Sequence, residues 1–132
     1  MAYVARKIPF VGTPDTNPET KPFFEGADQG KLMIKTCTKC GKAHFYPRGL
    51  CPFCFGDTEW KQASGKGKIY SISTLERANP PYTIAYVTLE EGPTMLTNIV
   101  DCDYKDLKIG QDVAVTFVKT EDGPSLPFFK PA

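Results

Sequence analysis

The pattern of apolar and polar positions divides the chain near residue 64. Beyond that point, apolar residues recur with the short spacings of strands, and clusters of Pro, Gly, Asn and Asp separate them. We expect five strands, at Ile69–Ala78, Tyr82–Leu89, Met95–Val100, Val113–Phe117 and Leu126–Phe129. Five strands with one longer connection, over residues 101–110, predict a small OB-type barrel, because a sandwich usually has about seven strands.

The first 30 residues predict an extended arm followed by a short helix. Residues 1–17 are rich in Pro, Gly and polar residues, which is typical of an arm. A helix is expected at about 21–29, because Thr20 or Asn17 can cap it, Pro22 is tolerated in its first turn and Gly30 can end it. Its apolar face would carry Phe23, Phe24 and Ala27.

Three short strands are expected between the helix and the barrel. They are Leu32–Thr36, His44–Tyr46 and Thr58–Gln62. A unit of about 30 residues cannot bury a sufficient core by itself. Trp60, the only tryptophan, is expected to cover the thin core of this unit. The chain is therefore divided into an arm and helix (1–30), a small ribbon (31–63) and a barrel (64–132).

Four cysteines in two Cys-x-x-Cys pairs can bind a metal ion that takes the place of a hydrophobic core in the ribbon. Cys37 and Cys40 form the first pair, and Cys51 and Cys54 form the second. Two such pairs can bring four sulfurs to the corners of a tetrahedron, which is the geometry of a structural Zn²⁺ site. Nearby Lys and Arg side chains, at positions 35, 39, 42 and 48, can offset the two net negative charges of a zinc tetrathiolate.

The same cysteines allow three other interpretations. Two disulfides suit redox enzymes better than scaffolds, and nothing in the chain indicates secretion. Iron in a rubredoxin-like site is the closer alternative, and it would make the chain an electron carrier. His44 could replace one cysteine, but four cysteines already complete the shell, so His44 is expected to begin a strand beside the metal.

Composition excludes several functional classes. The chain has 16 Lys and Arg residues and 15 Asp and Glu residues. Its net charge is therefore +1, and no overall positive field is present to attract nucleic acid. No apolar run approaches the ~18 residues of a membrane-spanning helix, and the N-terminus does not resemble a signal peptide. Metal-binding thiolates fit a reducing, cytoplasmic setting.

The residues show no active site of the chain's own. Nucleophilic catalysis needs a nucleophile, a base and an orienting group. The only histidine, His44, lies in the ribbon, and the fifth cysteine, Cys102, stands between two aspartates that disfavour its thiolate. The paired acids Glu90 and Glu91 are expected to lie in a solvated turn.

An ordered set of motifs resembles the DUF35 family, in which a rubredoxin-like zinc ribbon precedes an OB-fold. The motifs are Phe24-Glu25-Gly26, Cys37-x-x-Cys40-Gly41, Pro47, Cys51-x-x-Cys54, Ser64-Gly65-x-Gly67, Pro81-Tyr82, Leu89-Glu90-Glu91-Gly92-Pro93 and Ile109-Gly110-Gln111-x-Val113. The resemblance covers the chain from about residue 17 to Phe129. One departure is Phe24, where the family often has Trp.

This resemblance implies a non-catalytic subunit in a complex with a thiolase-like large subunit that processes acyl-CoA thioesters. The catalytic cysteine would then belong to the partner, and the small chain would act as a scaffold that helps to hold CoA. Cations are needed for the phosphates of CoA, and the candidates are Lys66, Lys68 and Arg77, which flank the first barrel strand.

A nucleic-acid-binding module is the alternative function, because OB-folds and zinc ribbons both occur in such proteins. Tyr70, Tyr82 and Tyr86 could stack bases on one barrel face. Few cations accompany them, so the phosphate contribution to binding would be small.

A surplus of apolar residues favours the partner hypothesis. We expect a partner to cover Ile8, Phe10 and Val11 in the arm, the strand Tyr82–Leu89, which is apolar on both faces, and the apolar segment Pro127–Phe129.

Overall fold

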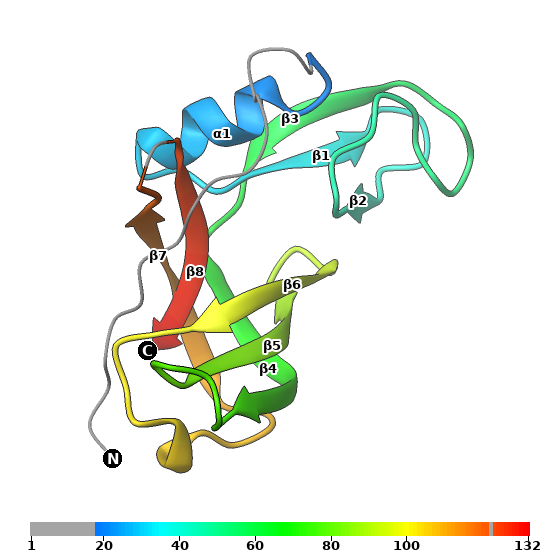
Figure 1. Cartoon of the computed structure of the whole chain (residues 1–132). Helices are drawn as coiled ribbons and strands as arrows, with labels where there is room; N and C mark the ends of the chain where they lie inside the picture. Colours follow the sequence, from blue (N-terminus) through cyan, green and yellow to red (C-terminus); the bar gives the residue numbers. More distant parts are fainter. Residues whose placement is uncertain (1–17, 122) are drawn as a thin grey trace.

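The computed structural model describes residues 18–121 and 123–132 as a helix, a three-stranded ribbon and a five-stranded barrel (Figure 1). The helix and ribbon comprise α1 (Lys21–Asp28), β1 (Met33–Cys37), β2 (Ala43–His44) and β3 (Thr58–Gln62). The barrel comprises β4 (Lys66–Leu75), β5 (Tyr82–Leu89), β6 (Thr94–Ile99), the 3₁₀ turn η2 (Tyr104–Asp106), β7 (Asp112–Lys119) and β8 (Ser125–Pro131). The arm, with its apolar Ile8, Phe10 and Val11, lies outside the described residues.

The ribbon is an antiparallel sheet with β1 in the centre, in the order β2-β1-β3. Lys35 on β1 pairs with His44 on one side and with Trp60 on the other. Trp60 is half-buried and packs against the hydrophobic core, in agreement with the prediction that it covers the core of the ribbon. The predicted strand at His44–Tyr46 is wrong in its bounds: pairing ends at His44, and the chain bends before Pro47.

The barrel closes in the order β4-β5-β6-β8-β7, with β7 pairing back onto β4. All its pairs are antiparallel except β6 with β8, which run parallel. The predicted five-stranded OB-fold is thereby confirmed. The first barrel strand starts and ends three residues earlier than its predicted range.

A bulge explains the mixed parity of the apolar residues in β4. The register shifts between Ile69 and Ser71, so Tyr70 has no counterpart on β5. The extra residue restores Ile72 to the inner side, where it packs against the core together with the fully buried Ile69.

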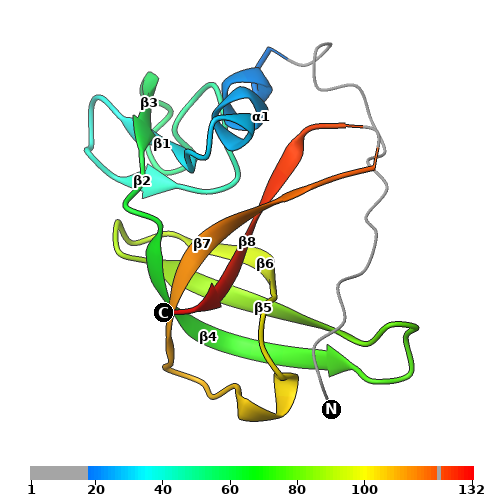
Figure 2. The ribbon, with the colours of Figure 1, turned by 90° about the vertical axis from the view of Figure 1, so that its left-hand side faces the viewer.

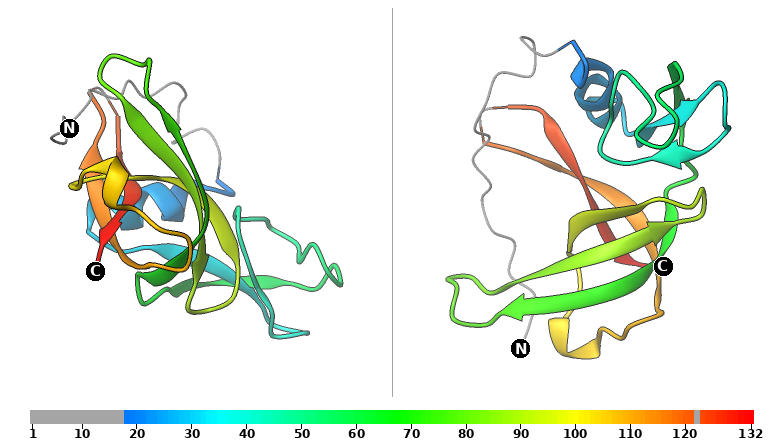
Figure 3. Two further views of the ribbon diagram at one scale, coloured as in Figure 1. Left: turned by 90° about the horizontal axis from the view of Figure 1, so that it is seen from below. Right: turned by 90° about the vertical axis from the view of Figure 1, so that its right-hand side faces the viewer.

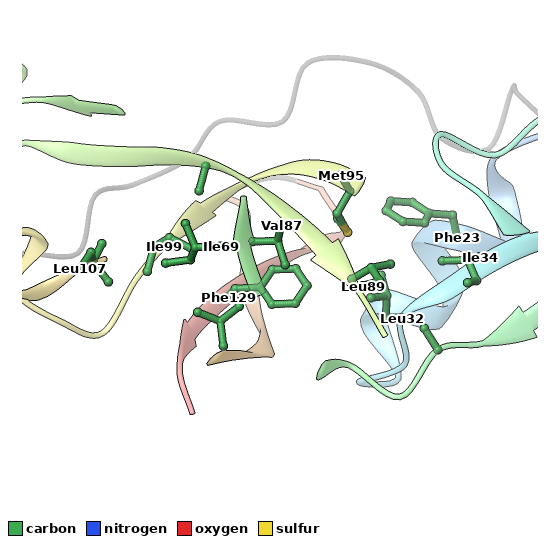
Figure 4. Packing of buried hydrophobic residues seen from close by; sticks show 13 residues of the cluster. Phe23, Leu32, Ile34, Ile69, Val87, Leu89, Met95, Ile99, Leu107 and Phe129 are labelled. Atoms are coloured by element: carbon green, nitrogen blue, oxygen red, sulfur yellow. The ribbon is translucent and has the colours of Figure 1, made fainter. Parts of the chain in front are cut away.

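The barrel core contains side chains from all five strands (Figure 4). Phe129 and Val87 are completely buried in it. The segment Pro127–Phe129 is also buried, so the expectation that a partner covers it is wrong. The reason is topological, because β8 is the strand that closes the barrel between β6 and β7.

Helix α1 joins the ribbon to the barrel. Phe23 and Ala27 are buried, and the helix contacts both β1 and β8. The β7–β8 hairpin rises from the barrel to the level of the helix (Figure 2), where the Ser125 amide donates to Asp28 at 2.8 Å. Phe23 and Ile34 of the first half therefore belong to the same cluster as Leu89 of the barrel.

The link between ribbon and barrel is held by hydrogen bonds on both sides. The Ser64 amide donates to Oε2 of Glu91 at 2.8 Å, and its hydroxyl donates to Glu90 at 3.4 Å. The Val115 amide donates to the Gly65 carbonyl at 2.7 Å. Glu90 and Glu91 lie in an exposed turn, as predicted, and this turn also holds the link between the ribbon and the barrel.

Gly67 lies where β5 leaves no room for a side chain on β4. A Cβ at Gly67 would lie 2.6 Å from Cγ1 of Val87 and 2.8 Å from the Thr88 carbonyl oxygen. We expect Gly67→Ala to lower the free energy of unfolding by about 2 kcal/mol, because the backbone of β5 cannot move aside without opening the barrel. Chemical denaturation measures this change.

Gly49→Ala is the matched control, because nothing lies within 4 Å of a Cβ at Gly49. It should change the free energy of unfolding by less than about 0.5 kcal/mol. Equal stability of the two variants would contradict the close approach of β4 and β5.

Candidate functional site

The four predicted metal-binding cysteines converge at the far end of the ribbon. Cys37 is the last residue of β1, and the other three lie in the turns on either side of β2. The two knuckles have the same backbone: the Gly41 amide donates to the Cys37 carbonyl at 3.1 Å, and the Phe55 amide donates to the Cys51 carbonyl at 2.9 Å.

The sulfur positions fit a tetrahedral metal ion. Sγ of Cys37 lies 3.5 Å from Sγ of Cys54, and Sγ of Cys40 lies 3.7 Å from Sγ of Cys51. All four sulfurs lie within 4.8 Å of one another. Sulfurs at 2.3 Å from a tetrahedral zinc are about 3.8 Å apart, so the cage needs little adjustment to hold Zn²⁺.

Backbone amides point at the sulfurs and bias their ionisation. The pKa of the Cys37 thiol is lowered to about 6, first by the amide of Cys40, which donates at 3.2 Å; burial opposes this and the amide of Lys39 reinforces it. The pKa of the Cys54 thiol is raised to about 11, because hydrogen bonds with neighbouring sulfurs and burial outweigh the lowering by the Gly56 amide. Zinc binding therefore displaces protons that the sulfurs otherwise share.

His44 lies outside the cage. The group of potential ligands among the described residues consists of the four cysteines. The Nε2 atom of His44 accepts from the Arg48 amide at 3.3 Å, which holds the loop between the knuckles. Burial, and then Lys35 and Arg48, lower the pKa of this imidazole, so it is neutral at pH 7.

The structure separates the three candidate CoA-binding cations. Lys66 and Lys68 are exposed at the start of β4, whereas Arg77 follows the other end of the strand. The seven residues after Lys68, up to the end of the strand at Leu75, span roughly 20 Å at about 3.3 Å each, and Arg77 lies in the turn beyond.

The two lysines line a hollow of about 510 Å³ at one end of the barrel. Glu90 and Asp112 also line it, and Nζ of Lys68 lies 2.6 Å from the Asp112 carboxylate. Both partners of this ion pair are more than two-thirds exposed, so the pair adds little stability. The four charged side chains of the hollow balance one another.

Cys102 has the environment expected of a structural thiol. Its side chain packs against the core just after β6. Burial is the largest of the effects that raise the pKa of this thiol, followed by Asp101, Asp103 and Asp106. A neutral thiol beside three carboxylates is a poor nucleophile.

Sequence reasoning missed two features of the surface. Glu91 anchors the ribbon to the barrel, and only its proximity to Ser64 in space reveals this role. Phe53 and Phe55 are 60% and 77% exposed on the second knuckle, where they flank a metal ligand. The described helices include none that is long and apolar enough to cross a membrane.

Comparison with known proteins supports this arrangement over most of the chain. The model of the ChsH2 rubredoxin-like zinc ribbon domain matches residues 24–60, and the model of the ChsH2 C-terminal OB-fold domain matches residues 60–118. The protein is therefore a zinc-ribbon–OB-fold protein, and its four cysteines are positioned to bind a metal ion.

Sequence relatives carry the DUF35 name. A DUF35 domain-containing scaffold protein of Methanocaldococcus jannaschii is 40% identical over 101 residues, which cover 70% of this chain and 72% of that protein. A scaffold protein of the same description from Methanothermobacter thermautotrophicus is 37% identical over 99 residues, covering 69% and 74%. The chain belongs to the DUF35 family.

A longer relative and two solved structures complete the comparison. A probable enoyl-CoA hydratase alpha subunit of Thermomonospora curvata is 32% identical over 90% of this chain, which spans 39% of that protein. A chain of the Ltp2-ChsH2(DUF35) aldolase superimposes with a TM-score of 0.77 at 30% identity, covering 87% of this chain and 95% of the other. A DUF35 protein of unknown function from Sulfolobus solfataricus has the same fold, with a TM-score of 0.66 at 18% identity over 88% of this chain and 87% of its own.

Removal of one cysteine tests the metal centre. We expect wild-type protein to contain one zinc per chain and Cys40→Ser to lose it, because three thiolates leave the tetrahedron open. Amide hydrogen exchange should then become fast over residues 33–62 and remain slow in β5 and β7. Slow exchange there would also support the predicted division between residues 31–63 and 64–132.

Cys102→Ser is the control, since this cysteine lies outside the cage. It should keep its zinc and its exchange pattern. Stoichiometric iron with a visible absorption band, or undiminished zinc in Cys40→Ser, would contradict a structural zinc site.

Proposed function

We propose that the chain is the non-catalytic subunit of a complex in which a larger, thiolase-like protein makes or breaks a carbon–carbon bond of an acyl-CoA thioester. The observation that carries this proposal is the match to the Ltp2-ChsH2(DUF35) aldolase, which includes both the ribbon and the barrel. The relatives described as scaffold proteins support the same role. The chain would contribute a docking surface, and its partner would contribute the nucleophile.

The described residues support a non-catalytic role. Nucleophilic catalysis needs a nucleophile within hydrogen-bond reach of a base. His44 is the single histidine of the sequence, and it is buried against the Arg48 amide. Cys102 has a raised pKa and acidic neighbours, and the other four cysteines form the metal cage. We place the complex in the cytoplasm, because thiolates that hold a metal persist in a reducing compartment.

CoA is the proposed ligand of the complex. Its phosphates lie on one nucleotide, so a single CoA can engage the start of β4 or its far end, but not both. Lys66 and Lys68 are the proposed contacts, with Arg77 as an independent candidate. Lys68 must exchange Asp112 for a phosphate, which an exposed ion pair permits at little cost.

The surface that would have to bind nucleic acid has few cations to contact the phosphates. Tyr70 and Tyr86 are 69% and 47% exposed and could stack bases. Single-strand binding also needs cations along the groove that holds the phosphates. Residues 70–75, 82–89 and 94–99, which surround these tyrosines on β4, β5 and β6, contain no Lys or Arg, and Lys66 and Lys68 lie at their edge, at the start of β4.

Co-expression with thiolase-family proteins of the source organism, beginning with the neighbouring reading frame, tests the proposed role. We expect one of them to co-elute with the chain in size exclusion and to turn over acyl-CoA only when both chains are present. The nucleophilic cysteine should map to the partner. An isolated chain that turns over acyl-CoA, or a partner fully active without it, would refute the role.

Titration calorimetry of the assembled complex with CoA tests the proposed contacts. Lys66→Ala and Lys68→Ala should each weaken CoA binding three- to tenfold, because each removes one charge-assisted contact to phosphate. Arg77→Ala serves as the comparison at the far end of β4. Unchanged affinity in all three variants would remove these residues from the CoA site.

A further inference from the structure

The outward face formed by residues 70–75, 82–89 and 94–99 of β4, β5 and β6 carries no charged side chain, although Lys68, which pairs with Thr88, borders it at the start of β4. Residues 70–75, 82–89 and 94–99 contain no Asp, Glu, Lys, Arg or His, although 23% of the whole chain is charged. Alternate residues of β5 and β6 are buried in the barrel, so the remaining positions face outward. Absence of charge, with tyrosine present, is the composition of an interface core and not of a solvated surface.

The centre of this face is shaped to receive a side chain. Tyr86 pairs directly with Leu96 on β6 and with Ser71 on β4. Leu96 is 54% exposed. These residues, with Ile84 and Ser73, line a hollow of about 100 Å³. A hollow between an exposed aromatic and an exposed aliphatic residue is a typical place for an anchoring side chain of a partner.

The sheet face alone is too small for a stable complex. Three strands about 4.8 Å apart and about six residues long cover roughly 300 Å². A standard interface buries about 800 Å² on each partner. A partner seated on this face must therefore also cover a neighbouring part of the molecule.

The ribbon supplies the neighbouring surface. It projects beyond the barrel on the side toward which β4, β5 and β6 face (Figures 1 and 3). Its second knuckle exposes Leu50, Phe53 and Phe55. Phe55 has a φ of 60°, the left-handed conformation that Gly41 adopts at the equivalent position of the first knuckle with a φ of 78°. A phenylalanine in a conformation that favours glycine, with its side chain exposed to solvent, indicates a role for that side chain.

The charge of the ribbon indicates the chemistry of the partner. Residues 31–63 contain six Lys and Arg and two Asp and Glu. A zinc tetrathiolate adds two negative charges, which leaves the ribbon basic by about two charges. The barrel face is uncharged, so the two parts favour different surfaces on one partner.

We propose that the β4–β5–β6 face and the second knuckle together form the docking surface for the larger subunit. This inference rests on the proposed function. The partner inserts an uncharged apolar projection against Tyr86 and Leu96, and an acidic surface of the same partner lies along the ribbon. The hollow at the lysine end of β4 stays outside this contact.

Two substitutions test the two parts of the surface, with the co-purifying thiolase-like protein as the probe. Leu96→Arg places a charge in the uncharged face and should weaken the affinity for the partner at least tenfold. Phe55→Gly relieves the backbone and should raise or maintain the melting temperature of the chain, yet weaken partner binding three- to tenfold. Hydrogen exchange of the wild-type complex should show protection in β5 and β6.

Lys130→Glu is the control, because it changes the charge of an exposed residue on β8 that pairs with Ala114 of β7 and is not part of the proposed surface. It should bind the partner within twofold of wild type. Zinc content and melting temperature verify that each variant is folded.

Four outcomes would overturn the proposed surface. Wild-type affinity in both Leu96→Arg and Phe55→Gly would refute the surface while the complex itself stands. Loss of self-association in Leu96→Arg, with partner binding unchanged, would assign the face to a second copy. Protection of β5 and β6 by a single-stranded oligonucleotide in place of the partner would assign it to nucleic acid. Failure of the wild-type chain to bind any thiolase-like protein would refute the proposed function, and the surface with it.

Discussion

The geometry of four sulfurs around one divalent ion is the constraint on which the ribbon depends. Strands of five, two and five residues cannot bury a core of their own. The sulfurs replace that core by joining the end of β1 to both knuckles, with opposing sulfur pairs 3.5 and 3.7 Å apart. The amides that donate to Cys37 are part of the same arrangement, because they stabilise the thiolate form that zinc requires.

The ribbon can act as a scaffold because its orientation on the barrel is held at two points. Helix α1 buries Phe23 between them, and Glu91 accepts the Ser64 amide within the three-residue link. The hydrophobic cluster runs without interruption from Ile34 to Phe129. A continuous core resists relative motion of its parts, so the ribbon and the β4–β5–β6 face would meet the proposed partner as one surface.

In the proposed complex, the distribution of charge would let a nearly neutral chain select its partner. The net charge of +1 conceals a basic ribbon and an uncharged sheet face. Uncharged contact area supplies affinity through burial, whereas the charged flank orients the partner. The hollow at the end of the barrel has no net side-chain charge, because its two lysines are balanced by two acids, Glu90 and Asp112.

The sequence by itself determined the cysteines of the candidate metal site, the helix and the places of the strands along the chain. Each follows from local spacing: paired cysteines, a proline and glycine at the helix ends, and alternation within strands. Tertiary structure alone decided which apolar residues remain exposed. Pro127–Phe129 looks like a free apolar segment in sequence, yet strand order places it in the barrel core. Glu91 meets Ser64 only because the β5–β6 turn folds beside the link. Such long-range contacts depend on closure of the barrel, which no local pattern specifies.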